Sequence, residues 1–420
     1  MGSRSAGPST TEAATAIHDW LKTQESRLLD LLEHLVTIES HAASPAGVAA
    51  VADTLIEQLD PLSFGFESVS PQPLPAEDHW LEELFSPGVP YEALGPTYVG
   101  SAPGSRAGHL LLLGDLDTAF PTGSLERFPF RIEGRRAYGP GIADMKGGLV
   151  VMLAALQALH HLGLERPTVT IVLAGDEQAG SLSSRPVIER VGAGANWCFC
   201  VECARDGGKL MAGRGHIGVA SLAITGLEAH TGSARESGVD ALEALAKLVL
   251  EFKALSDPQT GTLVTVTIAQ AGRRRSVVPA LAEATVDVRA RSAQAWDTVT
   301  SEMHEMATSV GGETGTTITL RTHSHRPGVM WDEHTDSLLA TASHLAVPLS
   351  IEVEAFESAA AGSSAFADPA TTTLDGLGPR GGGLMTPDEH IEIDSVVPRA
   401  ALLSSLISEL RVPPVRHRHR

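Results

Sequence analysis

The sequence predicts an α/β protein with a mostly parallel sheet, interrupted by a smaller α+β domain. Between residues 108 and 203, apolar runs of strand length alternate with helical segments, and such alternation is typical of a parallel sheet covered on both faces. Residues 209–325 instead follow the β-α-β-β-α-β order of ferredoxin-like domains. Acidic residues directly follow several predicted strands, which is where ligands collect in open α/β sheets.

Hydrophobic periodicity places the elements of the main domain. Residues 12–60 have helical spacing, and residues 61–107, which are rich in Pro, Gly and Ser, predict surface hairpins. The remaining segments alternate: strands 108–114, 168–174, 197–203, 348–355 and 371–375, and helices 147–162, 184–191, 335–345 and 394–410.

The change of pattern near residue 209 predicts the domain organisation. We expect a catalytic domain built from 1–208 and 326–415, with 1–12 disordered, an inserted lid at 209–325, and a basic tail at 416–420. Within the lid the pattern predicts strands in 209–225, 262–270, 282–291 and 316–322, and helices at 239–255 and 293–310.

Composition excludes several classes of partner. The net charge of −20 over 420 residues argues against nucleic acid or an anionic membrane surface. The sequence contains no run of about 18 uncharged apolar residues, so no membrane span is predicted. A cytoplasmic location is expected. Cys198, Cys200 and Cys203 are too few and too close for a disulfide framework. We interpret them as buried reduced thiols, because a zinc site needs a fourth ligand.

Five acidic residues stand at strand ends or in the loops that follow: Asp115, Asp117, Asp144, Glu177 and Glu202. Asp115 and Asp117 are two residues apart and would share a face of their strand. Carboxylates this close repel one another, so they need a cation or must share protons. The pattern therefore predicts a metal site or an acid–base site.

Four segments carry a resemblance to a known family: GPGIADMKGG, GDEQAGS, GLEAHTGSARESGVDALEALA and TVDVR. They resemble the di-zinc amidohydrolase and peptidase family of carboxypeptidase G, acetylornithine deacetylase, succinyl-diaminopimelate desuccinylase and aminoacylase. The resemblance runs from about residue 36 to the end of the C-terminal helix. It implies a catalytic α/β domain with a ferredoxin-like lid that often mediates dimerisation.

The resemblance also implies roles for the acidic residues. Asp144 would bridge two metals, and Asp115 and Glu202 would be ligands. Glu177 would be the general base, and Asp117 would orient the first ligand.

For the substrate, the resemblance implies an oxyanion donor at His230, acting in its own subunit or in the neighbouring subunit of a dimer, and a carboxylate clamp at Arg289. The loop Gly378–Gly383, including Gly382 and Gly383, would line the pocket. Ser276 stands where the family has a substrate-binding Asn.

Departures from the family pattern affect the metal ligands most. Asp115 replaces a His, Gln178 replaces a Glu and Met385 replaces a His, while Ser364 replaces an Asp. One metal position thus loses two of its three donors, and we expect it to be empty. The other keeps three oxygen donors, which suit Mg²⁺, Mn²⁺ or Ca²⁺ better than Zn²⁺.

Smaller candidates are interpreted as structural or surface groups. For Cys203, the alternative role is that of a nucleophile or a replacement metal ligand. For His390, the alternative is a side chain that reaches the vacant metal position. Arg273–Arg275 would add positive potential near the acidic cleft. The other candidates in this class are His216, His323 and His325.

Three functions remain open from the sequence. The first is hydrolysis of a C–N (amide) bond in a small carboxylate-bearing substrate by a homodimer, with Glu177 as base and one divalent cation (Mg, Mn or Zn). The second is a metal-independent enzyme with no cation, catalysing a lyase, isomerase or amide-forming step through acid–base chemistry. The third is a non-catalytic binding protein.

Overall fold

The computed structural model describes residues 10–205, 207–360 and 362–412. The chain divides into two compact units, each with its own hydrophobic core. The first, the main domain, runs to Gly213 and resumes over Trp331–Glu357 and from Gly362. The second, the lid domain, comprises Arg214–Met330 and Ser358–Ala361.

The main domain is built on a six-stranded sheet in the order β1-β2-β6-β3-β7-β14. Four strands run parallel to one another: β3 (His109–Asp115), β6 (Thr168–Ala174), β7 (Trp197–Cys200) and β14 (Thr372–Leu374). At one edge, β2 (Thr97–Ala102) and β1 (Gly65–Val69) add antiparallel pairs. The predicted mostly parallel sheet is confirmed, and its parallel strands end together at one edge.

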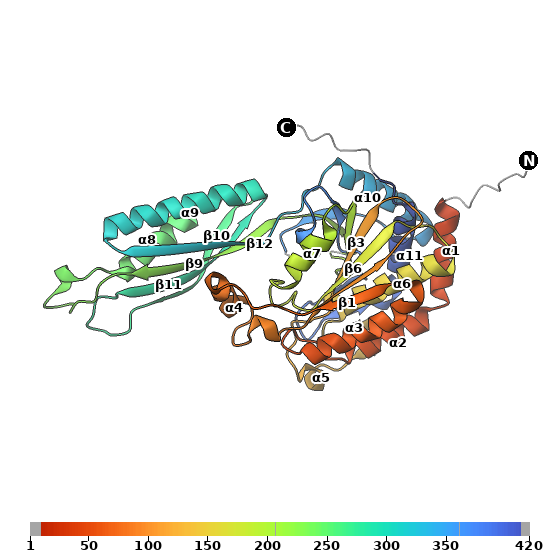
Figure 1. Ribbon diagram of the computed structural model, residues 1–420, viewed down its shortest axis with the longest axis horizontal. Helices are drawn as coiled ribbons and strands as arrows, with labels where there is room; N and C mark the ends of the chain where they lie inside the picture. The colour runs from red at the N-terminus through yellow and green to blue at the C-terminus, as the bar shows by residue number, and fades with distance from the viewer. Residues whose placement is uncertain (1–9, 206, 361, 413–420) are drawn as a thin grey trace, which may run out of the picture. The chain divides into compact units, whose positions relative to one another are not determined.

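Helices cover both faces of this sheet (Figure 1). A Cβ on Gly114 would lie 2.6 Å from Leu149 of α6 (Gly147–His161), and one on Gly192 of α7 (Ser184–Gly192) would lie 2.8 Å from Leu111. Positions 111 and 114 point to opposite faces of β3, so α6 and α7 lie on opposite faces. On the α6 side, α11 (Ile393–Glu409) packs against α6, and α1 (Thr10–Lys22) packs against α11.

Among the described residues, the segment Ile142–His161 is the one helical stretch long and apolar enough to cross a membrane by length and composition. It contains α6, and 89% of the apolar window is buried inside the structure. Its apolar surface is therefore used in the core of the main domain.

The remaining elements of the main domain surround this core. They are helices α2 (Glu25–Val36), α3 (Pro45–Leu59), α4 (His79–Phe85), α5 (Ser124–Arg127) and α10 (Glu333–Ala346), and strands β4 (Arg131–Glu133), β5 (Arg136–Tyr138), β8 (Leu210–Arg214), β13 (Ala355–Ser358), β15 (Gly381–Gly382) and β16 (His390–Glu392).

Three local predictions were wrong. Residues 61–107 are not simply surface hairpins, because they contain α4, the two main-sheet strands β1 and β2, and the fully buried Tyr91. The strand expected at 348–355 begins only at Ala355, since Val347–Leu349 forms a 3₁₀ turn followed by Ser350 at positive φ. Residues 10–12, expected to be disordered, lie in α1, whereas 1–9 and the basic tail lie outside the described residues.

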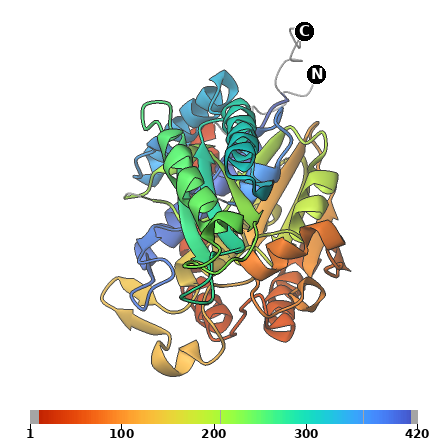
Figure 2. The ribbon, with the colours of Figure 1, turned by 90° about the vertical axis from the view of Figure 1, so that its left-hand side faces the viewer.

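The lid domain has the predicted β-α-β-β-α-β order: β9 (His216–Thr225), α8 (Ala241–Ala254), β10 (Leu263–Ala271), β11 (Leu281–Ala290), α9 (Ala293–Thr314) and β12 (Thr317–Arg326). Its antiparallel sheet has the order β10-β11-β9-β12. Alternate residues of β11 are buried, because α8 and α9 pack side by side on one face of the sheet (Figure 2).

We predict that Gly148→Ala destabilises the main domain by about 3 kcal/mol. A Cβ on Gly148 would lie 1.8 Å from the carbonyl oxygen of Val201, so α6 would have to move away from the backbone that leads to Glu202. Urea unfolding measures the change. Gly65→Ala is the control, because nothing lies within 4 Å of a Cβ there; equal stabilities of the two variants would contradict the packing argument.

Candidate active site

The acidic residues converge at the edge where the parallel strands end. Asp115 is the last residue of β3, Glu177 follows β6, and Glu202 follows β7. Burial, together with the charges of Glu177, Asp117 and Glu202, raises the pKa of Asp115 well above its usual range. Burial and the charges of Glu177 and Glu202 also raise the pKa of Asp144, to about 8. The structure thus brings the predicted acids of the main domain into one cluster.

Asp117 holds the loop that carries Glu177. It is 1% exposed, and its carboxylate accepts the backbone N–H groups of Glu177 (3.0 Å) and Gln178 (2.8 Å). Burial and the neighbouring charge of Glu177 raise its pKa, which these two bonds partly offset. Asp176, by contrast, accepts the backbone N–H groups of Ser183 and Ser184 at the start of α7 and serves the fold.

Asp144 lies in the turn before α6 and meets Gln178. The side-chain nitrogen Nε2 of Gln178 donates to Oδ2 of Asp144 at 3.4 Å. The peptide bond between Asp144 and Met145 is cis. Gly147, at the start of α6, cannot carry a side chain, since a Cβ would lie 2.7 Å from the carbonyl oxygen of Ile142. The glycines of ADMKGG therefore allow the turn to pack closely.

Sequence reasoning missed Glu389, which joins the Asp144 turn to the loop of Met385. Glu389 is 1% exposed, and its carboxylate accepts the backbone N–H groups of Ala143 (2.9 Å), Asp144 (3.1 Å) and Met385 (3.0 Å). Burial raises its pKa, and these three bonds oppose that rise. Its place in the sequence, before His390, gave no signal of these contacts.

Lys146 is a second residue that the sequence did not single out. It is 1% exposed, and its ammonium donates to the carbonyl oxygen of Ile38 at 2.6 Å. Burial lowers its pKa to about 7, while the charges of Glu389 and Glu39 oppose the shift. This hydrogen bond connects the turn after Asp144 to the segment that directly follows α2.

Glu202 and Asp115 are held by different neighbours. Ser363 donates its hydroxyl to Oδ1 of Asp115 at 2.9 Å. Arg205 lies 3.6 Å from Oε2 of Glu202. Both acids are almost fully buried: Asp115 is 2% exposed and Glu202 is 6% exposed.

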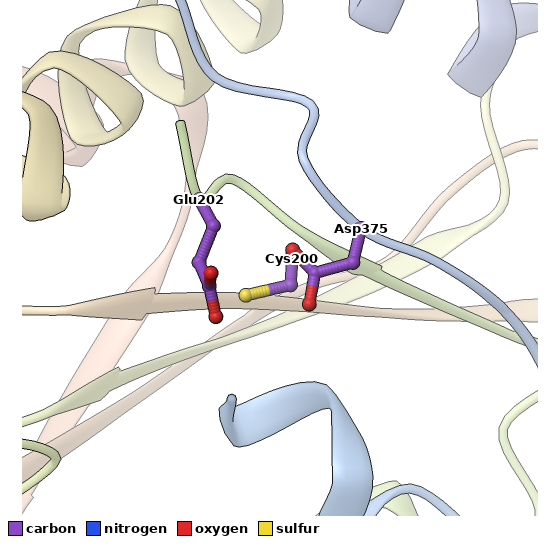
Figure 3. A group of neighbouring side chains, drawn as sticks. All are labelled: Cys200, Glu202 and Asp375. Atoms are coloured by element: carbon purple, nitrogen blue, oxygen red, sulfur yellow. The ribbon is translucent and has the colours of Figure 1, made fainter. Parts of the chain in front are cut away.

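Cys200, Glu202 and Asp375 lie close together near the end of β7, with their side chains turned toward one another (Figure 3). One ligand atom of each lies within 4.8 Å of the others. Asp375, which the sequence did not single out, accepts the hydroxyl of Ser364 and the backbone N–H of Gly376, both at 2.5 Å. Ser364 therefore supports Asp375 in this structure.

The three cysteines are free thiols and are buried. Burial raises the pKa of Cys203 to about 12 and that of Cys198 still further. Cys203 lies 3.5 Å from the carbonyl oxygen of Ala204, to which its thiol donates. A thiol is not nucleophilic until it ionises, so the nucleophile alternative for Cys203 loses support.

The donor sets of the two family metal positions differ in how well they fit a cation. Asp115 and Glu202 are buried and Asp144 is partly buried, and the charge of Glu202 acts on both aspartates; a hard divalent cation would neutralise these carboxylates. The second position would combine Asp144 with residues 178 and 385. Gln178 presents an N–H donor to Asp144, and the Met385 side chain is 57% exposed. The residues present therefore fit one cation and do not fit the second.

The glycine-rich loop after β14 lies against the strand that ends in Glu202. Gly378 donates its N–H to the carbonyl oxygen of Glu202 at 2.8 Å. Gly382 pairs with His390 between β15 and β16, and Gly383 has a φ of +67°. His390 engages the carbonyl oxygen of Asp388 through Nδ1 at 2.9 Å. The positive φ accounts for glycine at position 383.

Within the lid, His230 and Ser276 lie together. His230 forms a bridge with Val277, and Thr231 donates its N–H to the carbonyl oxygen of Ser276 at 3.1 Å. Nδ1 of the exposed His230 accepts the N–H groups of Gly232 and Ser233. A neutral ring in this arrangement carries its proton on Nε2 and can donate there.

Arg289 lies at the opposite end of the lid sheet. It pairs with Ile217 at the start of β9, and about 27 Å of strand separate it from Leu281, at the end of β11 nearer Ser276. Its guanidinium donates to Asp287 (3.0 Å) and to the carbonyl oxygen of Ala359 (2.8 Å).

The other lid candidates have local partners. Arg274 pairs with Glu228 at 2.8 Å, and His216 stacks on Trp296 with ring centroids 4.9 Å apart. The rings of His323 and His325 lie 6.3 Å apart. Arg273 and Arg274 line a hollow beside the β10–β11 turn.

Together, the lid-bearing α/β fold and the acidic strand ends define a metallopeptidase-like scaffold. The chain belongs to Peptidase family M20/M25/M40, whose sequence model matches residues 111–409. This confirms the resemblance found in the sequence.

Relatives and solved structures agree with this assignment. Carboxypeptidase G2 of Pseudomonas sp. (strain RS-16) is 32% identical over 286 residues, covering 68% of this chain and 65% of that protein. Succinyl-diaminopimelate desuccinylase of Erythrobacter litoralis is 26% identical, covering 68% of this chain and 75% of that protein. Aminopeptidase PepT from Bacillus cereus has the same fold, with a TM-score of 0.75 at 17% identity, covering 92% of this chain and 98% of that one.

We predict that the native protein does not react with a thiol reagent such as DTNB at neutral pH, because all three thiols are buried. In guanidinium chloride the three should react fully. Reaction of the native protein with one equivalent would show an accessible thiol and contradict this description.

Proposed function

We propose that the protein hydrolyses a C–N (amide) bond in a small carboxylate-bearing substrate, using one divalent cation (Mg, Mn or Zn) held by Asp115, Asp144 and Glu202. The observation that carries the proposal is the convergence of these carboxylates with Glu177 at one sheet edge, in a chain of this family. A cytoplasmic location belongs to the same proposal.

The chain's own residues supply base and positioning. When bound, the cation would supply positive charge that acidifies a water and polarises a carbonyl. The Glu177 carboxylate takes a proton from the water whose oxygen bonds to the carbonyl carbon, and delivers it to the leaving nitrogen as the C–N bond breaks. The products are a carboxylate and an amine. Asp117 keeps Glu177 in place through its backbone N–H.

The lid would recognise the substrate. Nε2–H of His230 is the proposed oxyanion donor, Arg289 the proposed carboxylate clamp, and Ser276, Gly382 and Gly383 the proposed pocket residues. His230 and Arg289 stand at opposite ends of the lid sheet, which supports a homodimer through the lid in which one copy supplies His230 to the site of the other.

A metal-independent acid–base enzyme is the second candidate. The contact that favours it is that of Gln178 with Asp144, in which a neutral N–H donor takes a place that a cation would otherwise hold. Full activity after exhaustive removal of divalent ions would select this candidate over the hydrolase that needs a cation.

Metal removal tests the principal proposal. We predict about one bound divalent ion per chain, because the three carboxylates make one site of hard donors. Dialysis against a strong chelator should abolish hydrolysis of N-acetylornithine, N-succinyl-diaminopimelate or aminobenzoyl-glutamate, whichever is cleaved, and Mn²⁺ should restore it.

Replacement of the base gives an independent check. Glu177→Gln keeps the shape of the side chain but cannot take a proton, so kcat should fall by about 10²–10⁴-fold while the bound metal stays constant. Glu67→Gln, on the exposed part of β1, is the control and should match the wild type. An unchanged kcat in Glu177→Gln would remove Glu177 from the mechanism.

A further inference from the structure

Gln178 occupies a defined place beside the bridging carboxylate. Its Nε2 donates to Oδ2 of Asp144 at 3.4 Å, so the NH₂ group of the amide lies on this side. Such a group carries two N–H donors. Asp144 takes one of them, and no other hydrogen bond of this side chain falls within the described residues.

The amide is mounted on a fixed loop. The backbone N–H of Gln178 donates to Asp117 at 2.8 Å, and the Tyr91 hydroxyl donates to the carbonyl oxygen of the next residue, Ala179, at 2.5 Å. The other partner in the Gln178–Asp144 contact is also fixed, because the backbone N–H of Asp144 donates to Glu389. A donor held in this way needs little reorganisation to meet developing charge.

A second cation would have poor ligands at this position. It would face the N–H side of an amide and, at residue 385, a thioether. The Met385 side chain is 57% exposed, although its backbone N–H is held by Glu389. Asp144 would be the one remaining carboxylate, and it already accepts from Gln178.

We propose that Gln178 takes the place of the second cation: one N–H holds Asp144 and the other donates to the carbonyl oxygen of the substrate. As water adds to the carbonyl carbon, negative charge grows on that oxygen, and a preorganised neutral donor stabilises it. Gln178 and the base Glu177 are adjacent and are positioned by the same Asp117 carboxylate. This inference rests on the proposed hydrolysis and specifies how the carbonyl is polarised.

Metal counting by elemental analysis tests the replacement without any activity assay. The wild type should bind about one Mn²⁺ or Zn²⁺ per chain and the double variant Gln178→Glu, Met385→His about two, because the double variant regains a carboxylate and an imidazole. Two ions in the wild type would overturn the inference, as would a double variant that still binds one.

Kinetics tests the donor role in the metal-loaded protein. Gln178→Ala should lower kcat by about 10²–10³-fold, with little change in KM, in melting temperature or in the single bound metal. Gln178→Glu should fall by a similar factor, since an ionised carboxylate cannot donate. Gln72→Ala, at an exposed position, is the control and should match the wild type.

The outcomes separate this inference from the function on which it rests. Wild-type kcat in Gln178→Ala, or loss of its metal, would overturn the donor role while leaving the hydrolase intact. Absence of turnover by the wild type on N-acetylornithine, N-succinyl-diaminopimelate and aminobenzoyl-glutamate would overturn the proposed function and the donor role with it. The metal count would still decide whether Gln178 replaces a cation.

Discussion

Burial of several carboxylates at one sheet edge is the constraint on which the rest of this site depends. A carboxylate removed from water needs N–H donors, a cation or a proton. The loops around the edge meet this need in an ordered way: Asp117 accepts two backbone N–H groups and Glu389 accepts three. These acids fix the loops, whereas Glu202 repels both Asp115 and Asp144, and the three carboxylates form the place for a positive charge.

The carboxylate network also explains why the substitutions at 178 and 385 can coexist with an intact frame. The Asp144 turn is held from behind by Glu389 and by the packing of α6 on the backbone near Val201. Because this support does not involve residue 178 or the side chain of residue 385, both could change without loss of the turn. The contact from Gln178 then adds a neutral donor to Oδ2 of Asp144.

Much of the fold could be predicted from the sequence because it rests on local patterns. The apolar runs that end in Asp115, Glu177 and Glu202 gave both the strands and the edge at which they meet. Glu389, Asp375 and Lys146 could not be predicted, because each acts through partners far away in the chain and has no local periodic signal. The same reason applies to residues 61–107, where β2 becomes a strand by pairing with β6, which lies about 70 residues further along the chain, and with β1.

The number and place of the cations are the central claim of this account. Anomalous diffraction from crystals grown with excess Mn²⁺ would test it most directly. We predict one strong peak per chain, among Asp115, Asp144 and Glu202, and a Gln178 side chain in contact with Asp144. A second peak between Asp144 and Gln178, or the absence of any peak at the carboxylates, would contradict it.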